Sequence, residues 1–317
     1  MKYLMLGAAA LAIAACSQET ATEPAETPTD AMAAGDAEDG MNGEEHDAMD
    51  HGDMSASEKL DAVLDAQPDE IKARYEYRHP KETLEFFGVE PGMTVVDILP
   101  GEPGWYGEIL IPYLGPDGTL IGADYSVEMW GEFGGFANEE FLENKKSFNE
   151  DYVAAVEAAG GEDGANAAAF QFGSLPADLE GTADVVLMMR AAHHFNRFND
   201  GAYFTEALED INAVLKPGGI VGVVQHRAQE DMPDDWAVGN AGYVKQSHII
   251  SLFEDAGFEL VESSEINANP ADRPTAEDVV WRLPPSLGTS RDNPELKAEM
   301  EAIGESDRMT LKFKKPE

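Results

Sequence analysis

The sequence is poor in positive charge and in cysteine, and each shortage excludes a class of protein. Its 317 residues carry 21 Lys and Arg against 62 Asp and Glu, which gives a formal net charge of −41. Because a phosphate backbone is bound by displacing its counterions with Lys and Arg, nucleic acid is not an expected partner. The single cysteine, Cys16, has no second cysteine to pair with. The fold must therefore be stable through packing, without a disulfide.

An apolar run near the start of the chain, residues 3–15, is too short to span a membrane as a helix. It follows the positive Lys2 and ends in Ile-Ala-Ala-Cys (13–16), which resembles the bacterial lipobox. The resemblance implies that residues 1–16 are a lipoprotein signal peptide and that Cys16 carries a lipid anchor. Ser17 after the cysteine implies sorting to the periplasmic face of the outer membrane. An ordinary secretory signal with an incidental cysteine is the alternative.

Residues 17–56 contain no aromatic residue and no Val, Ile or Leu, and they hold 12 acidic side chains with no Lys or Arg. Such a segment cannot bury enough apolar surface to offset its chain entropy. We expect an acidic disordered tether here, followed by a folded domain at 57–317. Thioether and imidazole groups cluster in the tether: Met41, His46, Met49, His51 and Met54. They are ligands that suit copper, although their chance placement in a polar spacer is the favoured alternative.

From residue 57 onward, short apolar runs alternate with segments of helical spacing. Seven runs are predicted to be strands: 93–99, 119–125, 168–172, 183–189, 219–226, 258–266 and 308–315. Helices are predicted at 58–66, 69–87, 104–115, 136–160, 201–215, 243–257 and 292–303. This alternation implies a doubly wound α/β domain with a mostly parallel sheet. The long connection between the last two strands suits an antiparallel final strand.

Several motifs carry a resemblance to a known family. VVDILPGEPG (95–104), GAD (122–124) and LKPGG (215–219) resemble the class I S-adenosylmethionine-dependent methyltransferases. RHPKETLEFFG (78–88) and IGESDRMTLKFKKP (303–316) look closest to a subgroup of methyltransferases exported from the cytoplasm. The resemblance implies a Rossmann-like seven-stranded methyltransferase sheet with an antiparallel last strand. It also implies S-adenosylmethionine as cofactor and a small molecule as methyl acceptor.

The resemblance assigns a cofactor site to five residues. Asp97 would steady the amino-acid end of the cofactor, and Asp124 would accept the ribose hydroxyls. Gly101 and Gly104 supply a turn that lets the backbone approach a ligand, which glycine permits. Ser174 stands where the family has an adenine-contacting acid.

The glycine turn departs from the family pattern, in which glycine occupies alternate positions after the acid. Leu99 stands at the first of these positions and Pro103 at the third, while Gly104 comes one place late. A degenerate glycine turn is weak support for a cofactor. The alternative is a methyltransferase scaffold whose catalysis has changed and which binds a periplasmic ligand or a metal as a lipoprotein. Export favours this alternative, because S-adenosylmethionine is made inside the cell.

Histidines and an arginine follow the fourth and fifth predicted strands. Arg190, His193 and His194 come after the fourth, and His226 ends the fifth. Ligands of open α/β sheets bind beyond the carboxyl ends of the strands, so these side chains are the candidate catalytic residues. They suit acid–base chemistry, an anionic substrate or a metal ion. A loop-capping role for His194, or an ion pair for Arg190, is the structural alternative.

The lipid anchor has a direct test. Replacing the only cysteine (Cys16→Ser) removes the thiol that would receive the lipid, and we expect the protein to move from the membrane fraction to the soluble fraction. Fractionation of cells expressing each form, with Ser17→Thr as a control that keeps the thiol, measures this. Unchanged membrane retention of Cys16→Ser would contradict the prediction.

Overall fold

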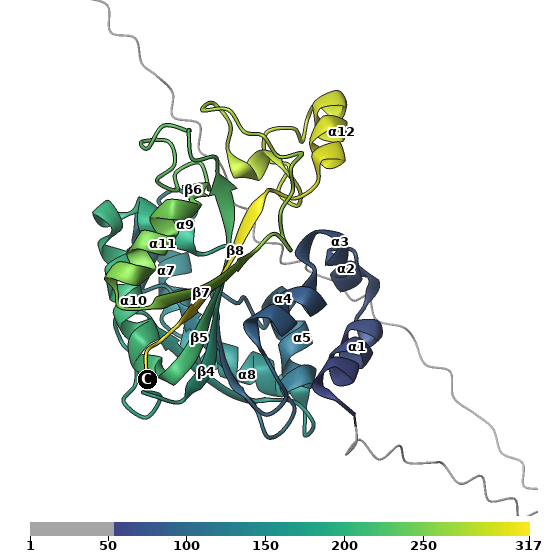
Figure 1. Cartoon of the computed structure of the whole chain (residues 1–317), viewed down its shortest axis with the longest axis vertical. Helices are drawn as coiled ribbons and strands as arrows, with labels where there is room; N and C mark the ends of the chain where they lie inside the picture. The colour runs from purple at the N-terminus through teal and green to yellow at the C-terminus, as the bar shows by residue number, and fades with distance from the viewer. Residues whose placement is uncertain (1–53) are drawn as a thin grey trace, which may run out of the picture.

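The computed structural model describes residues 54–317, and most of its hydrophobic core lies around one sheet (Figure 1). The strands are β1 (Thr94–Ile98), β2 (Thr119–Asp124), β3 (Asn166–Gln171), β4 (Ala183–Met189), β5 (Leu215–Ala228), β6 (Val244–Lys245), β7 (Glu259–Ser264) and β8 (Arg308–Lys314). Predictions about the signal peptide, the lipid anchor and all but the last three residues of the tether at 17–56 fall on residues 1–53, outside the described part. Of those three residues, Ser55 caps the first helix and Ala56 begins it. No helix among residues 54–317 is long and apolar enough to cross a membrane.

The sheet has the order β3-β2-β1-β4-β5-β8-β7, with β6 paired to the end of β5. Strands β1 to β5 run parallel, and β8 lies antiparallel between β5 and β7. The predicted fold class is confirmed: a Rossmann-like, mostly parallel α/β sheet with an antiparallel last strand. All seven predicted strands are present, and the two-residue strand β6 is an addition that its short length hid from the sequence pattern.

The helices are α1 (Ala56–Ala66), α2 (Asp69–Lys72), α3 (Tyr75–Arg78), α4 (Pro80–Phe87), α5 (Gly104–Leu114), α6 (Val127–Glu132), α7 (Glu139–Lys145), α8 (Phe148–Gly160), α9 (Ala192–Arg197), α10 (Ala202–Val214), α11 (Gln246–Asp255) and α12 (Pro294–Ile303). The single helix predicted at 69–87 is wrong. His79 takes a left-handed conformation (φ 40°) before Pro80, because the proline ring disfavours a helical residue in front of it. The helix predicted at 136–160 is also divided, at Lys146 and Ser147.

Different helices cover the two faces of the sheet, because side chains alternate along each strand. Val96 and Ile98 of β1 pack with α9, α10 and α11, whereas Val95 packs with α1, α4, α5 and α8 (Figure 1). The packing on the second face is close. A Cβ atom on Gly222 of β5 would lie 2.5 Å from the Phe87 ring of α4, so only glycine lets that ring rest on the strand.

One buried carboxylate joins the N-terminal helices to the last strand. Glu305, just before β8, pairs with Arg74 (2.7 Å), with Arg78 of α3 (3.4 Å) and with Arg308 of β8 (3.2 Å). Burial alone raises the pKa of Glu305, but the charges of Arg78 and Arg308 outweigh it and hold that pKa at about 2. These ion pairs fix α3 over the carboxyl ends of the central strands.

Replacing this carboxylate by an amide (Glu305→Gln) leaves buried arginines without their partner. We expect the free energy of unfolding at pH 7 to fall by about 3–5 kcal/mol, as measured by urea denaturation. The folded-state pKa of Glu305 is below its ordinary value of 4.5. The wild-type advantage should therefore be complete above about pH 4.5 and be lost as the pH falls toward 2.

The control is Glu301→Gln, which breaks an exposed i,i+4 pair with Lys297. It should change the stability by less than about 0.5 kcal/mol. A Glu305→Gln protein as stable at pH 7 as this control would show that the buried ion pairs do not hold the helices to β8.

Candidate functional site

A cavity of about 320 Å³ lies beyond the carboxyl ends of β1 and β2, where ligands bind in open α/β sheets. The loop after β1 forms one wall, and aromatic residues of the segment after β2 form the opposite wall. The lining residues are Leu99, Pro100, Gly101, Glu102, Asp124, Trp130, Phe133, Phe136, Phe141, Lys145, Phe148 and His194. The volume lies in the range of small-molecule sites.

The loop after β1 has the backbone conformation that its glycines predict. Gly101 (φ 87°) and Gly104 (φ 77°) both lie in the left-handed region, and no atom lies within 4 Å of the place a Cβ of Gly104 would take. Leu99 also has a positive φ, of 56°, and its backbone N–H donates to Ala123 of β2. The leucine side chain faces the cavity, as expected from its place in the glycine motif.

The carboxylate of Asp124 is already bonded on both oxygens. Oδ1 accepts from the backbone N–H of Tyr125 (2.8 Å) and from Nε1 of Trp130 (3.1 Å). Oδ2 pairs with Nζ of Lys145 (2.9 Å), whose ammonium also lies 4.7 Å from the centroid of the Trp130 ring. A carboxylate has about four lone-pair sites, and three are used here. One ribose hydroxyl could bond beside these groups, and two could bond only if Lys145 moved.

Asp97 lies at the end of β1, is almost completely buried, and shares the sheet face of Val95. No hydrogen bond to its carboxyl group is found among the described residues. Burial raises the pKa of Asp97 to about 7, and the opposing charge of Arg190 limits the rise. Asp97 therefore provides a carboxyl group that changes charge near neutral pH and that a bound cation would ionise.

The three predicted histidines lie close together. The ring centroids of His193 and His194 are 3.9 Å apart, and those of His193 and His226 are 5.4 Å apart. His194 also lines the cavity, and its Nδ1 bonds the hydroxyl of Tyr125 (2.9 Å) instead of capping a loop. Nδ1 of His226 bonds the hydroxyl of Ser306 (2.5 Å). Burial lowers the pKa values of His194 and His226 well below the ordinary range, so both rings are neutral at pH 7.

Gln225 fixes the proton of His193. The amide nitrogen of Gln225 donates to the carbonyl oxygens of His226 and Gly242, so its Oε1 must face His193 and accept. It accepts from the backbone N–H and from Nδ1 of His193, both at 3.3 Å. The ring proton is therefore on Nδ1, and Nε2 keeps a buried lone pair that no polar group of residues 54–317 approaches within hydrogen-bond distance. Burial lowers the pKa of His193 to about 3, so the ring stays neutral.

Arg190 and Ser174, the other predicted site residues, both lie outside the cavity lining. Arg190 follows β4 in a left-handed conformation (φ 63°), and its guanidinium makes no ion pair with any described residue. Ser174 is exposed and lies outside the cavity lining, because its hydroxyl donates to the carbonyl of Gln171 (2.8 Å) and closes a turn. Within residues 54–317, no group of three His, Cys, Asp or Glu side chains is arranged to hold a metal ion.

The sequence prediction missed Lys145, Trp130 and the phenylalanines that line the cavity. Lys145 and Lys146 form one of the few basic clusters of an acidic chain, but the sequence does not indicate that Lys145 lies beside Asp124. Except for Phe148, the first residue of α8, the aromatic residues lie on α6, α7 and the segments that connect them, between β2 and α8.

No family model and no curated protein sequence matches the chain. Its fold is similar to that of solved structures that include an S-adenosylmethionine-dependent methyltransferase from Aquifex aeolicus (18% identity, 63% of this chain and 93% of that one, TM-score 0.43). It is also similar to a geranyl diphosphate methyltransferase in complex with GPP and sinefungin (13% identity, 76% of this chain and 79% of that one, TM-score 0.46). A third similar structure is that of the [4+2]-cyclase SpnF (16% identity, 75% of this chain and 80% of that one, TM-score 0.45). With TM-scores below 0.5, no residue role is carried over from them.

The pKa of Asp97 leads to a prediction. Its folded-state pKa is raised from 3.8 to about 7, so wild-type protein should lose stability as the pH rises from about 4 to 7. Asp97→Asn should remove this loss and be more stable than wild type at pH 8, by on the order of 2–4 kcal/mol, with the difference closing by about pH 4. Thermal unfolding across this pH range measures it.

The control is Asp117→Asn, in an exposed turn, whose stability should follow the wild-type curve. A difference between Asp97→Asn and wild type that stays constant from pH 5 to pH 8 would exclude titration of Asp97 as its cause.

Proposed function

We propose that the domain is an S-adenosylmethionine-dependent methyltransferase that acts on a small molecule, and that the cavity beyond β1 and β2 holds the cofactor. The observation that carries the proposal is the coincidence of three features in one cavity. They are the left-handed turn at Gly101, the buried carboxylate of Asp124 at the end of β2, and an aromatic wall that includes Trp130. Each suits a different part of this cofactor.

The donor set fits the chemistry of the cofactor. Trp130 and Phe133 offer faces on which a purine ring can stack, which is worth about 1–3 kcal/mol per base. Asp124 can accept a ribose hydroxyl on its remaining lone pair. Asp97 lies at the end of the neighbouring strand β1, where its carboxyl group would offset the positive charge of the cofactor. When bound, the cofactor supplies a methyl group on a positively charged sulfur.

The protein's own contribution to transfer is to orient the acceptor at His193. Its Nε2 lone pair has no partner among the described residues, because Gln225 holds the ring proton on Nδ1. With a pKa of about 3, this nitrogen would accept a hydrogen bond from the hydroxyl, thiol or amine that takes up the methyl group and would orient it, without holding its proton. Its neighbours His194 and His226 stay neutral at pH 7 and would act as hydrogen-bonding partners of the acceptor.

We also propose that the protein is anchored through Cys16 to the periplasmic face of the outer membrane. The lipobox-like IAAC (13–16) followed by Ser17 supports this proposal. The acidic tether would then separate the domain from the anchor.

A second candidate is a scaffold that keeps the fold and binds a different small molecule outside the cytoplasm. One observation favours it: Lys145 holds the Asp124 carboxylate that a ribose would need, and Leu99 faces the cavity where the family has glycine. Cofactor affinity separates the two candidates.

The test is isothermal titration of the purified full chain with S-adenosylhomocysteine. We expect wild type to bind and Asp124→Asn to bind about 10- to 100-fold more weakly, because charge-assisted hydrogen bonds to the ribose contribute about 1.5–3 kcal/mol. Lys145→Met should bind more tightly than wild type, because the ammonium no longer competes for Asp124. Lys146→Met, the exposed neighbour, is the matched control and should match wild type.

Equal binding by wild type and Asp124→Asn would contradict the placement of the ribose. Absence of binding to wild type would favour the scaffold that has changed its ligand.

A further inference from the structure

Positive charge gathers at one buried place in this acidic protein. Arg78 and Arg308 are 7% and 2% exposed, and Arg74 and Arg190 are only partly exposed beside them. Arg78 lies with its guanidinium 4.6 Å from the centroid of the Trp105 ring. Glu305 is the carboxylate that pairs with Arg74, Arg78 and Arg308.

The sheet places these charges in a row. Strands β1, β4, β5 and β8 are consecutive neighbours. Arg190, His226 and Arg308 stand at one edge of them, and Asp97 lies further into the sheet, opposite Leu187, which is three residues before Arg190. His226 and Arg308 are direct partners in the register of β5 and β8. The alternation along each strand puts Asp97 and His226 on the face that α4 and α5 cover. The row therefore lies under α3, and the catalytic candidates His193 and His226 are at its centre.

In this region the arginines outnumber the carboxylates. Glu305 serves three arginines, whereas Arg190 has no ion pair and its guanidinium has no hydrogen bond among the described residues. Asp97 does not compensate fully, because burial keeps part of its population protonated near pH 7. Burial, and after it the positive charge of Arg190, lower the pKa of Arg78 to about 9. Arg190 and Arg78 are therefore close enough to repel one another. A buried cation without a partner is costly, and an anion would remove the cost.

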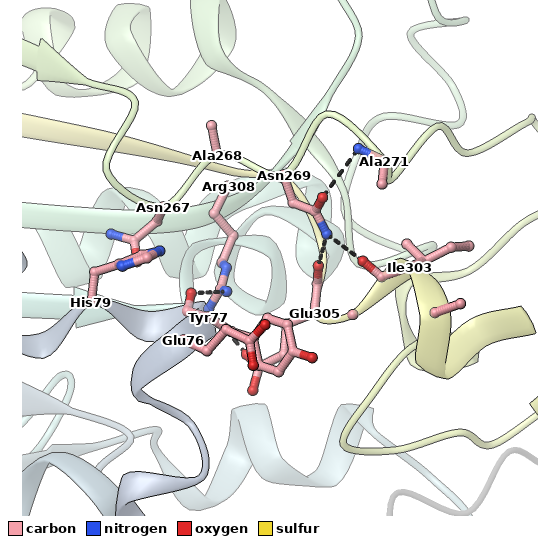
Figure 2. Close-up of a pocket in the computed structure, with 12 residues that line it drawn as sticks. Glu76, Tyr77, His79, Asn267, Ala268, Asn269, Ala271, Ile303, Glu305 and Arg308 are labelled. Atoms are coloured by element: carbon pink, nitrogen blue, oxygen red, sulfur yellow. Dashed lines mark hydrogen bonds and ion pairs between the residues drawn. The ribbon is translucent and has the colours of Figure 1, made fainter. Parts of the chain in front are cut away.

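The backbone of Arg190 is a second, independent observation. It holds a left-handed conformation (φ 63°) that costs a residue with a side chain about 1 kcal/mol or more, and a hydrogen bond from its N–H to Val224 (2.6 Å) keeps it there. Such strain is typical of residues that are held in place for a ligand. A cavity of about 370 Å³ opens onto Arg308 and Glu305 at the other end of this arginine cluster, and Arg190 is not among its lining residues (Figure 2).

We propose that the methyl acceptor carries an anionic group, a carboxylate or a phosphate, and that Arg190 binds this group with Arg78 behind it. The inference rests on the proposed function, whose acceptor it describes. A planar guanidinium binds two oxygens of either group side by side, which orients the molecule as well as attracting it. The nucleophilic atom of the acceptor would then face the bare Nε2 of His193.

The test uses inorganic phosphate and succinate as probes, with sodium chloride at equal ionic strength as the reference. Thermal unfolding of the purified full chain should show stabilisation by phosphate or succinate beyond that by chloride. Arg190→Gln should weaken the apparent affinity at least tenfold, and Arg190→Lys should be intermediate. Arg291→Gln, an exposed arginine, is the matched control and should respond as wild type does.

The stability of Arg190→Gln without added anion shows whether this variant folds. Without any added anion, Arg190→Gln should be at least as stable as wild type, because it removes the repulsion of Arg78. Equal stabilisation of wild type and Arg190→Gln, or none of wild type beyond chloride, would overturn the proposal. Titration of wild type with S-adenosylhomocysteine separates the two inferences. If it fails to bind while the phosphate response still depends on Arg190, the anion site stands and the proposed function does not.

Discussion

The ion pairs of Glu305 with Arg74, Arg78 and Arg308 are the interaction on which the arrangement of this site depends. They join the N-terminal helices to β8 across more than 200 residues of sequence, and they place α3 over the carboxyl ends of the central strands. Because one carboxylate pairs with three guanidinium groups and cannot neutralise them all, this edge of the sheet stays positively charged. A protein of net charge −41 thus keeps a cationic centre where its buried histidines lie.

The two proposed binding regions meet at the carboxyl end of β4. On one side, the aromatic wall and the Gly101 turn enclose a mostly apolar cavity, and on the other the arginine row offers charge. His194 lines the cavity, and its ring centroid lies 3.9 Å from that of the tilted His193 ring, so it connects the two regions through ring contacts. For transfer, an acceptor bound at the arginine row would have to bring its nucleophilic atom into direct contact with the methyl group at this boundary.

Apolar runs predicted every main strand of the sheet, and strand ends predicted the edge where Asp97, Asp124 and the histidines gather. These features are local, since a buried strand and its last residue can be recognised in fewer than ten residues. The role of Lys145 was not predictable in this way, because its partner Asp124 lies 21 residues away. Likewise, the left-handed His79 before Pro80 divides a segment whose helical spacing looked continuous. Glu305 and its arginines depend on contacts that only the complete fold creates.

The central claim is that a cofactor occupies the cavity between Gly101 and Trp130 and takes its ribose contact from Asp124. A crystal structure of the protein with S-adenosylhomocysteine tests it most directly. The account predicts ligand density in this cavity and a ribose hydroxyl within hydrogen-bond distance of Asp124, on the lone pair that Tyr125, Trp130 and Lys145 leave free. An empty cavity with the pair of Lys145 and Asp124 intact, at a ligand concentration that saturates binding in solution, would contradict the account.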